Sequence, residues 1–99
     1  MSLQNQQSEF AKALGLLIIY AYSIGYELTF GDTYPGKFKH KDGSWHEKGL
    51  AIDLNAFKDS IYLQRTEDHD PLGIYWETLG GTWGGRWDDG NHYSWGECK

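Results

Sequence analysis

The apolar run from Leu50 to Leu54 constrains the fold most, because it contains a carboxylate. Side chains point to alternate faces of an extended strand, so Leu50, Ile52 and Leu54 share one face. Ala51 and Asp53 then share the opposite face. An ionised carboxylate is costly to bury unless a partner compensates its charge, and a cation is a common partner. The run therefore predicts a strand that is apolar on one face and carries a cation-binding carboxylate on the other.

Two histidines complete a candidate metal site with Asp53. His46 precedes the apolar run, and His92 belongs to a polar cluster near the end of the chain, Asp88-Asp89-Gly90-Asn91-His92. Two imidazoles and one carboxylate leave the fourth zinc position open for water, which is the arrangement of catalytic zinc. We predict one zinc ion per chain, bound by His46, Asp53 and His92. Asp89, three residues before His92, is the candidate general base.

The first third of the chain is predicted to form a supporting helix. Apolar residues recur at helical spacing from Phe10 to Ala21, Ser8 is a suitable N-cap, and Gly25 is a suitable stop. We expect a helix over residues 8–24 that packs behind a sheet and carries no chemistry. Residues 1–7 are expected to be a frayed or disordered leader.

The other elements alternate between strand and helix patterns. We expect strands near residues 26–30, 50–54, 61–63 and 92–95, and a helix over 71–79 that starts at Asp70-Pro71. His69, just before this helix, is expected to be exposed to solvent or to cap the helix. The fold class predicted is a small single α+β domain over residues 1–99, in which an antiparallel sheet with flanking helices surrounds the zinc site.

Composition narrows the class of protein. Ninety-nine residues suit one domain, and a net charge of -5 argues against nucleic acid as a partner. Cys98 is the only cysteine, so an internal disulfide is impossible and zinc is favoured as the stabilising link. The apolar stretch 13–24 is too short to span a membrane, and the start of the chain lacks the features of a signal peptide. We therefore expect a monomer that is made in the cytoplasm.

Four short motifs occur in order along the chain: Ser44-x-His46, Gly49-x-Ala51-Ile52-Asp53, Trp83-Gly84-Gly85 and Asp89-x-x-His92. With these four motifs, the sequence resembles the zinc peptidases that cut peptidoglycan peptides, and the resemblance covers residues 26–96. That superfamily contains D-alanyl-D-alanine carboxypeptidases, D-Ala-D-Ala dipeptidases and phage L-alanyl-D-glutamate endopeptidases. The resemblance implies that His46, Asp53 and His92 bind zinc, that Asp89 activates water, and that peptidoglycan peptides are the partner.

The substrate-binding residues depart from the family pattern. Relatives carry an arginine after the first strand, where this chain reads Tyr34-Pro35-Gly36-Lys37. Either Lys37 supplies the positive charge, less well than a guanidinium would, or the contact is absent. Arg86 is a candidate replacement, although a surface salt bridge is the commoner role for such a residue. Ser44 either orients a metal ligand or caps a turn.

The favoured function is hydrolysis of peptidoglycan stem peptides by an L-alanyl-D-glutamate endopeptidase of phage or prophage type. The short chain without a signal peptide favours this branch, and the enzyme would reach the bacterial wall after release from the cell. The alternatives are a D-alanyl-D-alanine carboxypeptidase and a zinc-containing module that binds wall peptides without cutting them. A structural zinc site closed by His40, Glu47 or Cys98 is a further alternative, but it would need no base at Asp89.

Overall fold

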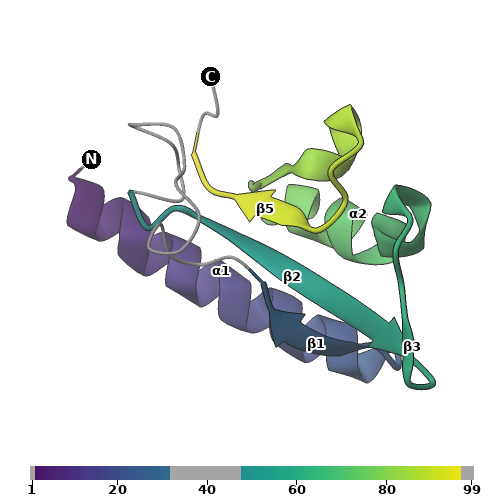
Figure 1. Ribbon diagram of the computed structural model, residues 1–99. Helices are drawn as coiled ribbons and strands as arrows, with labels where there is room; N and C mark the ends of the chain where they lie inside the picture. Colours follow the sequence, from purple (N-terminus) through teal and green to yellow (C-terminus); the bar gives the residue numbers. More distant parts are fainter. Residues whose placement is uncertain (1, 32–47, 97–99) are drawn as a thin grey trace.

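The structure, a computed structural model, describes residues 2–31 and 48–96. Two α-helices, five strands and two short 3-10 helices alternate along these residues (Figure 1). Their bounds are α1 Leu3–Ser23, β1 Glu27–Phe30, β2 Ala51–Lys58, β3 Ile61–Tyr62, η1 Thr66–His69, α2 Asp70–Thr78, β4 Thr82–Trp83, η2 Gly84–Trp87 and β5 His92–Ser94. The predicted α+β class is confirmed.

The strands form an antiparallel sheet around β2. The order is β1-β2-β5-β4, and β3 also pairs with β2. The turn between β2 and β3 is tight, because Asp59 and Ser60 both adopt positive φ, the conformation of a two-residue hairpin loop. This arrangement makes β2 the central strand, so the residues on its two faces decide where the core and the site lie.

One face of β2 is in the hydrophobic core and the other carries the polar residues. Ile52 and Leu54 are buried, whereas Asp53 and Asn55 are only half-buried, as the alternation in the sequence predicts. Leu50, just before the strand, is buried with them. The core also takes residues from both α-helices and from the last two strands, among them Phe10, Leu17, Leu72, Trp76, Trp83 and Tyr93. Asp53 therefore stands on the face of the sheet opposite to its main apolar core.

Helix α1 begins earlier than predicted. It starts at Leu3 rather than at Ser8, because the Ser2 side chain caps it by accepting a hydrogen bond from the Asn5 amide at 3.1 Å. Residues 3–7, for which a disordered leader is predicted, form its first turns. The amide of Gln7 donates to the Lys48 carbonyl at 2.7 Å and ties these turns to the start of β2. The predicted start is therefore wrong, whereas the predicted stop at Gly25, with φ of 91°, is confirmed.

Helix α2 agrees with the prediction, but the residue before it does not. The helix spans Asp70–Thr78 with Pro71 in its first turn, and Tyr75 stacks on Tyr20 of α1 with ring centroids 4.1 Å apart. His69 is 3% exposed, so the expected exposure to solvent is wrong; it does occupy the N-cap position of α2, but its side chain makes no capping hydrogen bond. The reason is the short helix η1, which precedes α2 directly and buries the imidazole against the protein.

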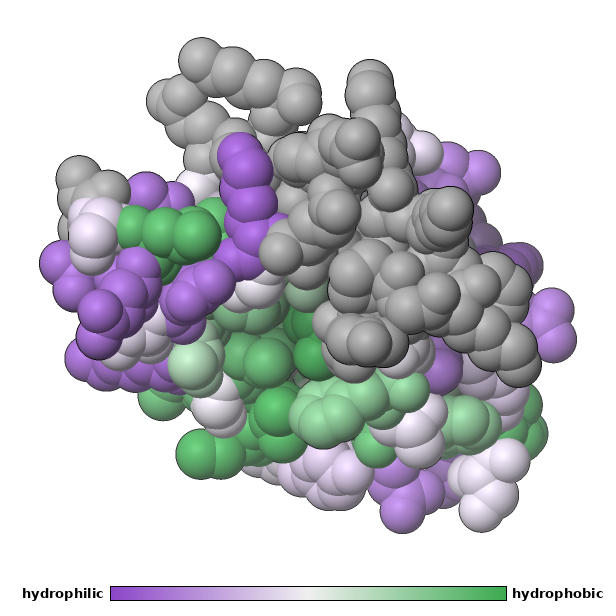
Figure 2. Space-filling model, turned by 60° about the vertical axis from the view of Figure 1, so that its left-hand side comes forward, coloured by the Kyte–Doolittle hydropathy of each residue, from purple (hydrophilic) through white to green (hydrophobic). Residues whose placement is uncertain are grey.

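The outer surface keeps several large apolar side chains in contact with solvent, including Ile19 at 69% exposure. Figure 2 shows one face of the molecule, on which hydrophobic and hydrophilic residues gather in separate areas. In the described part of the chain, neither helix combines the length and apolar character that crossing a membrane requires.

Candidate active site

Asp53 and His92 meet across two neighbouring strands. Asp53 on β2 lies directly opposite His92 at the start of β5, and directly opposed residues of antiparallel strands project from the same face. The Nδ1 atom of His92 is 3.6 Å from Oδ1 of Asp53, and their side chains are 12% and 23% exposed. The sheet thus brings together two of the three predicted metal ligands, which are far apart in the sequence.

Two glycines let other segments approach these two residues. A Cβ atom at Gly31 would lie 3.1 Å from Cβ of Asp53, and the Gly31 amide donates to the Asp53 carbonyl at 2.7 Å. A Cβ atom at Gly84 would lie 2.7 Å from Cβ of His92 and would also collide with the carbonyl oxygen of Asp89. The Trp83-Gly84-Gly85 segment of the sequence therefore has a steric role at the site.

The loop between η2 and β5 is fixed by hydrogen bonds at both ends. The Asp89 amide donates to the Gly84 carbonyl at 2.9 Å, and the His92 amide donates to the Asp89 carbonyl at 3.1 Å. The buried indole of Trp83 donates to the Gly90 carbonyl at 2.8 Å. Asp89 and His92 are therefore held in a defined relation by the backbone, as the Asp89-x-x-His92 spacing requires of a base and a ligand.

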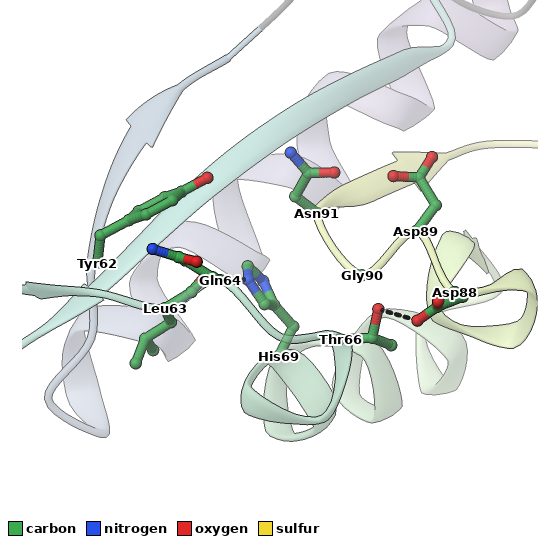
Figure 3. A pocket seen from close by; sticks show the side chains of 9 residues that line it. All are labelled: Tyr62, Leu63, Gln64, Thr66, His69, Asp88, Asp89, Gly90 and Asn91. Atoms are coloured by element: carbon green, nitrogen blue, oxygen red, sulfur yellow. Dashed lines mark hydrogen bonds between the residues drawn. The ribbon is translucent and has the colours of Figure 1, made fainter.

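The two acidic residues of this loop point in different directions (Figure 3). Asp88 has a φ of 62° and accepts a hydrogen bond from the Thr66 hydroxyl at 2.9 Å. Asp89 points away from Thr66. Both residues line a cavity of about 150 Å³. Asp89 therefore borders the cavity and belongs to the loop that leads into His92.

The donors present suit zinc. A half-buried carboxylate beside an imidazole is a common part of zinc sites. His46, the third predicted ligand, lies outside the described residues, as do His40, Glu47 and Cys98. Within residues 2–31 and 48–96, no group of three or more His, Cys, Asp or Glu side chains could hold a metal ion. The described residues therefore supply two of the three predicted zinc ligands, and the role of His46 stays a prediction.

The three candidate substrate-binding residues have different outcomes. Lys37 and Ser44 lie outside the described residues. Arg86 is engaged by Glu77, to which its Nε and Nη2 atoms donate at 2.8 and 2.5 Å, and its guanidinium lies 5.4 Å from the centroid of the Trp83 ring. This bidentate pair is the surface salt bridge that the sequence analysis weighs as the alternative role for Arg86.

Substituting Gly84 should disturb the site while the rest of the fold remains. We expect Gly84→Ala to weaken zinc binding by about 10–100-fold, because the added methyl group displaces both His92 and the Asp89 backbone. Gly15→Ala is the matched control, since no atom lies within 4 Å of the added Cβ at that helical position. Zinc affinity measured by competition with a chelating dye checks this. Equal affinities of the two variants would show that Gly84 does not position His92.

The pair between Arg86 and Glu77 should make stability depend on pH in the acid range. Hydrogen bonding from Arg86 holds the pKa of Glu77 below its ordinary value of 4.5. Because the pKa is lower in the folded state, the stabilisation is complete above the ordinary value and is lost as the pH falls through the folded value. Melting temperatures of wild type and Glu77→Gln should therefore differ at neutral pH and converge in acid. Glu9→Gln, the same change at an exposed position of α1, is the control. A difference that stays constant down to about pH 2 would contradict the pairing.

No sequence motif predicts the cavity beside Asp89. Its lining comes from β3, η1 and the loop before β5, which are distant in the sequence and meet only in the fold. The one local signal is the cluster Asp88-Asp89-Gly90-Asn91, all four residues of which line it.

Comparison with known families identifies the class of protein. The sequence profile of a family described as D-alanyl-D-alanine carboxypeptidase matches residues 38–95, which is more than half of the 99 residues. The matched segment contains His46, Asp53, Asp89 and His92. No curated protein matches the chain. Because the match covers more than half of the chain, the chain belongs to the D-alanyl-D-alanine carboxypeptidase family of M15 peptidases.

Proposed function

We propose that the protein is a zinc-dependent peptidase that cuts peptidoglycan stem peptides, and that it cuts the bond between L-alanine and D-glutamate. The observation that carries the proposal is the pairing of Asp53 with His92 on adjacent strands, with Asp89 fixed in the loop that leads into His92. A structural metal site needs the ligands but has no use for a carboxylate held beside them.

His46, Asp53 and His92 would hold the ion, with both imidazoles neutral and the carboxylate ionised. When bound, zinc acts as a Lewis acid that polarises the substrate carbonyl and makes water more acidic. Gly31 and Gly84 keep the backbone close to Asp53 and His92, so the two ligands have little room to move. Trp87, half exposed, lies beside His92 with ring centroids 5.7 Å apart and shields the imidazole on that side.

Asp89 serves as the proton carrier in this proposal. Its carboxylate takes a proton from the attacking water as the oxygen–carbon bond forms at the alanyl carbonyl. The resulting carboxylic acid then gives this proton to the nitrogen of D-glutamate as the carbon–nitrogen bond breaks. Hydrogen bonds of the Asp89 backbone to Gly84 and His92 would keep the side chain in reach of both steps.

The engagement of Arg86 by Glu77 favours an endopeptidase over a carboxypeptidase. A carboxypeptidase has to hold the free carboxylate of its substrate, for which a guanidinium or an ammonium group is suited. The side chain of Arg86 is instead bound to Glu77. The second candidate, a D-alanyl-D-alanine carboxypeptidase, is favoured by the description of the matched family.

A single substrate distinguishes the endopeptidase from the carboxypeptidase. A pentapeptide muropeptide that contains both the L-Ala–D-Glu and the D-Ala–D-Ala bonds should be incubated with the zinc-loaded protein and its products identified by mass spectrometry. We expect release of a tetrapeptide that begins with D-glutamate. Release of D-alanine alone would make the protein a carboxypeptidase. Binding of the muropeptide without any cleavage would leave only a wall-peptide binding module.

A further inference from the structure

The cavity beside Asp89 has no role in the chemistry proposed above. It is formed where β3, η1 and the loop before β5 meet, and its volume is about 150 Å³. Side chains of Tyr62, Gln64, His69, Asp88 and Asn91 surround it together with Asp89 (Figure 3). Because Asp89 belongs to its wall, a substrate that reaches the proposed base can place a neighbouring group in the cavity.

The cavity is rich in hydrogen-bond acceptors and negative in charge. Among the described residues that line it, Asp88 and Asp89 are the acidic ones and none is a lysine or an arginine. The Thr66 hydroxyl donates to Oδ1 of Asp88, which fixes the orientation of that carboxylate and leaves it further lone pairs. A ligand group with several donors and a positive charge is the complement of such a site.

His69 gives independent evidence that the ligand of this cavity carries a hydrogen-bond donor. The imidazole is 3% exposed, and its Nε2 atom lies 3.1 Å from the Leu63 carbonyl oxygen. Because a carbonyl only accepts, Nε2 must carry the proton, so in the neutral ring Nδ1 is an acceptor. Among the described residues no donor reaches Nδ1, which is buried. Figure 3 shows the ring extending from its helix towards the other side chains of the cavity. A buried acceptor without a partner is unfavourable, and a donor placed in the cavity would relieve it.

We propose that this cavity binds the side-chain ammonium group of a diamino acid in the substrate peptide. This inference rests on the proposed function, since the residue that follows D-glutamate in peptidoglycan stem peptides is a diamino acid. An ammonium group carries three donors and one positive charge, which match the Asp88 carboxylate, the amide oxygens of Gln64 and Asn91, and the acceptor on His69. The cavity would then select peptides by the residue beyond the bond that is cut.

Two peptides that differ in one group test the proposal by binding alone. The probes are γ-D-glutamyl-L-lysine amide and γ-D-glutamyl-L-norleucine amide, titrated into the zinc-loaded protein and followed by backbone amide NMR. We expect the lysine peptide to bind about tenfold more tightly, because hydrogen bonds to charged groups are among the stronger ones. The shifted amides should include those of Gln64, Asp88 and Asn91. Equal affinities, or shifts that spare these residues, would overturn the proposal.

A matched pair of variants locates the effect. Asp88→Asn removes the charge but keeps an acceptor for Thr66, and asparagine tolerates the left-handed conformation of this position. We expect it to abolish most of the preference for lysine. Asp59→Asn makes the same change at another left-handed position, which does not line the cavity, and should keep the preference. An Asp88→Asn protein that still prefers lysine tenfold would overturn the assignment.

The same comparison of lysine with norleucine, made with muropeptides that contain the L-Ala–D-Glu bond, separates this proposal from the proposed function. If the lysine peptide is preferred but no muropeptide is cut, the cavity binds an ammonium group and the proposed function is wrong. If lysine and norleucine muropeptides are cut with equal kcat/KM, the proposed function stands and the assignment of the cavity is wrong.

Discussion

Asp89→Asn should lower kcat for muropeptide hydrolysis by about 100-fold or more, while the protein keeps its zinc and its fold. Asparagine has the shape of aspartate but cannot take a proton from water. The backbone bonds of Asp89 to Gly84 and His92 do not involve the side chain, so they should persist in the variant. Single-turnover hydrolysis of an L-Ala–D-Glu muropeptide, with zinc content measured on the same samples, checks the prediction.

The control for this experiment is Asp59→Asn, an exposed aspartate in the turn between β2 and β3, which should keep full activity. Three results would speak against the role of Asp89. Equal turnover by wild type and Asp89→Asn would remove it from the mechanism. Loss of zinc would make it a metal ligand, and loss of the folded state would make it a structural residue of the loop.

His46→Ala should abolish stoichiometric zinc binding and lower the stability of the zinc-loaded protein. His46 is the predicted ligand that lies outside the described residues, so this variant tests the third ligand directly. A ligand that binds only the folded state at 1,000 times its dissociation constant stabilises that state by about 4.1 kcal/mol. We therefore expect the thermal shift caused by zinc in the wild type to be almost absent in His46→Ala.

His40→Ala is the matched control, because this histidine precedes His46 in the same segment and has no place in the Ser44-x-His46 motif. It should retain one zinc per chain and the full thermal shift. The opposite outcome, in which His40→Ala loses zinc and His46→Ala keeps it, would exchange the two histidines in the site.

The position of Asp53 could be predicted from sequence because strand periodicity is a local property. Leu50, Ile52 and Leu54 alternate with Asp53, and burial follows that alternation in the fold. The pairing of Asp53 with His92 is a long-range property of strand order, which residue spacing does not determine. It could be anticipated through the resemblance to a known family, whose motifs link residues that only the sheet brings together.

Other features could not be predicted, for physical reasons. The first turns of α1 are polar and face solvent, so hydrophobic periodicity carries no signal there, and the start depends on a single cap at Ser2. The burial of His69 depends on where η1 packs against the rest of the fold. The cavity beside Asp89 requires three segments to meet, and its acceptor-rich lining follows from their side chains only after they have done so.

The most direct test of a zinc peptidase is the dependence of hydrolysis on zinc stoichiometry. Metal-free protein should be titrated with zinc from zero to two equivalents while the cleavage of the pentapeptide muropeptide is followed. We predict no cleavage without metal, a linear rise in rate, and a maximum at one equivalent per chain, with cleavage between L-alanine and D-glutamate. Stoichiometric zinc binding without any hydrolysis would contradict the claim that the protein is a zinc peptidase. Hydrolysis at the same rate with and without a chelator would contradict it as well.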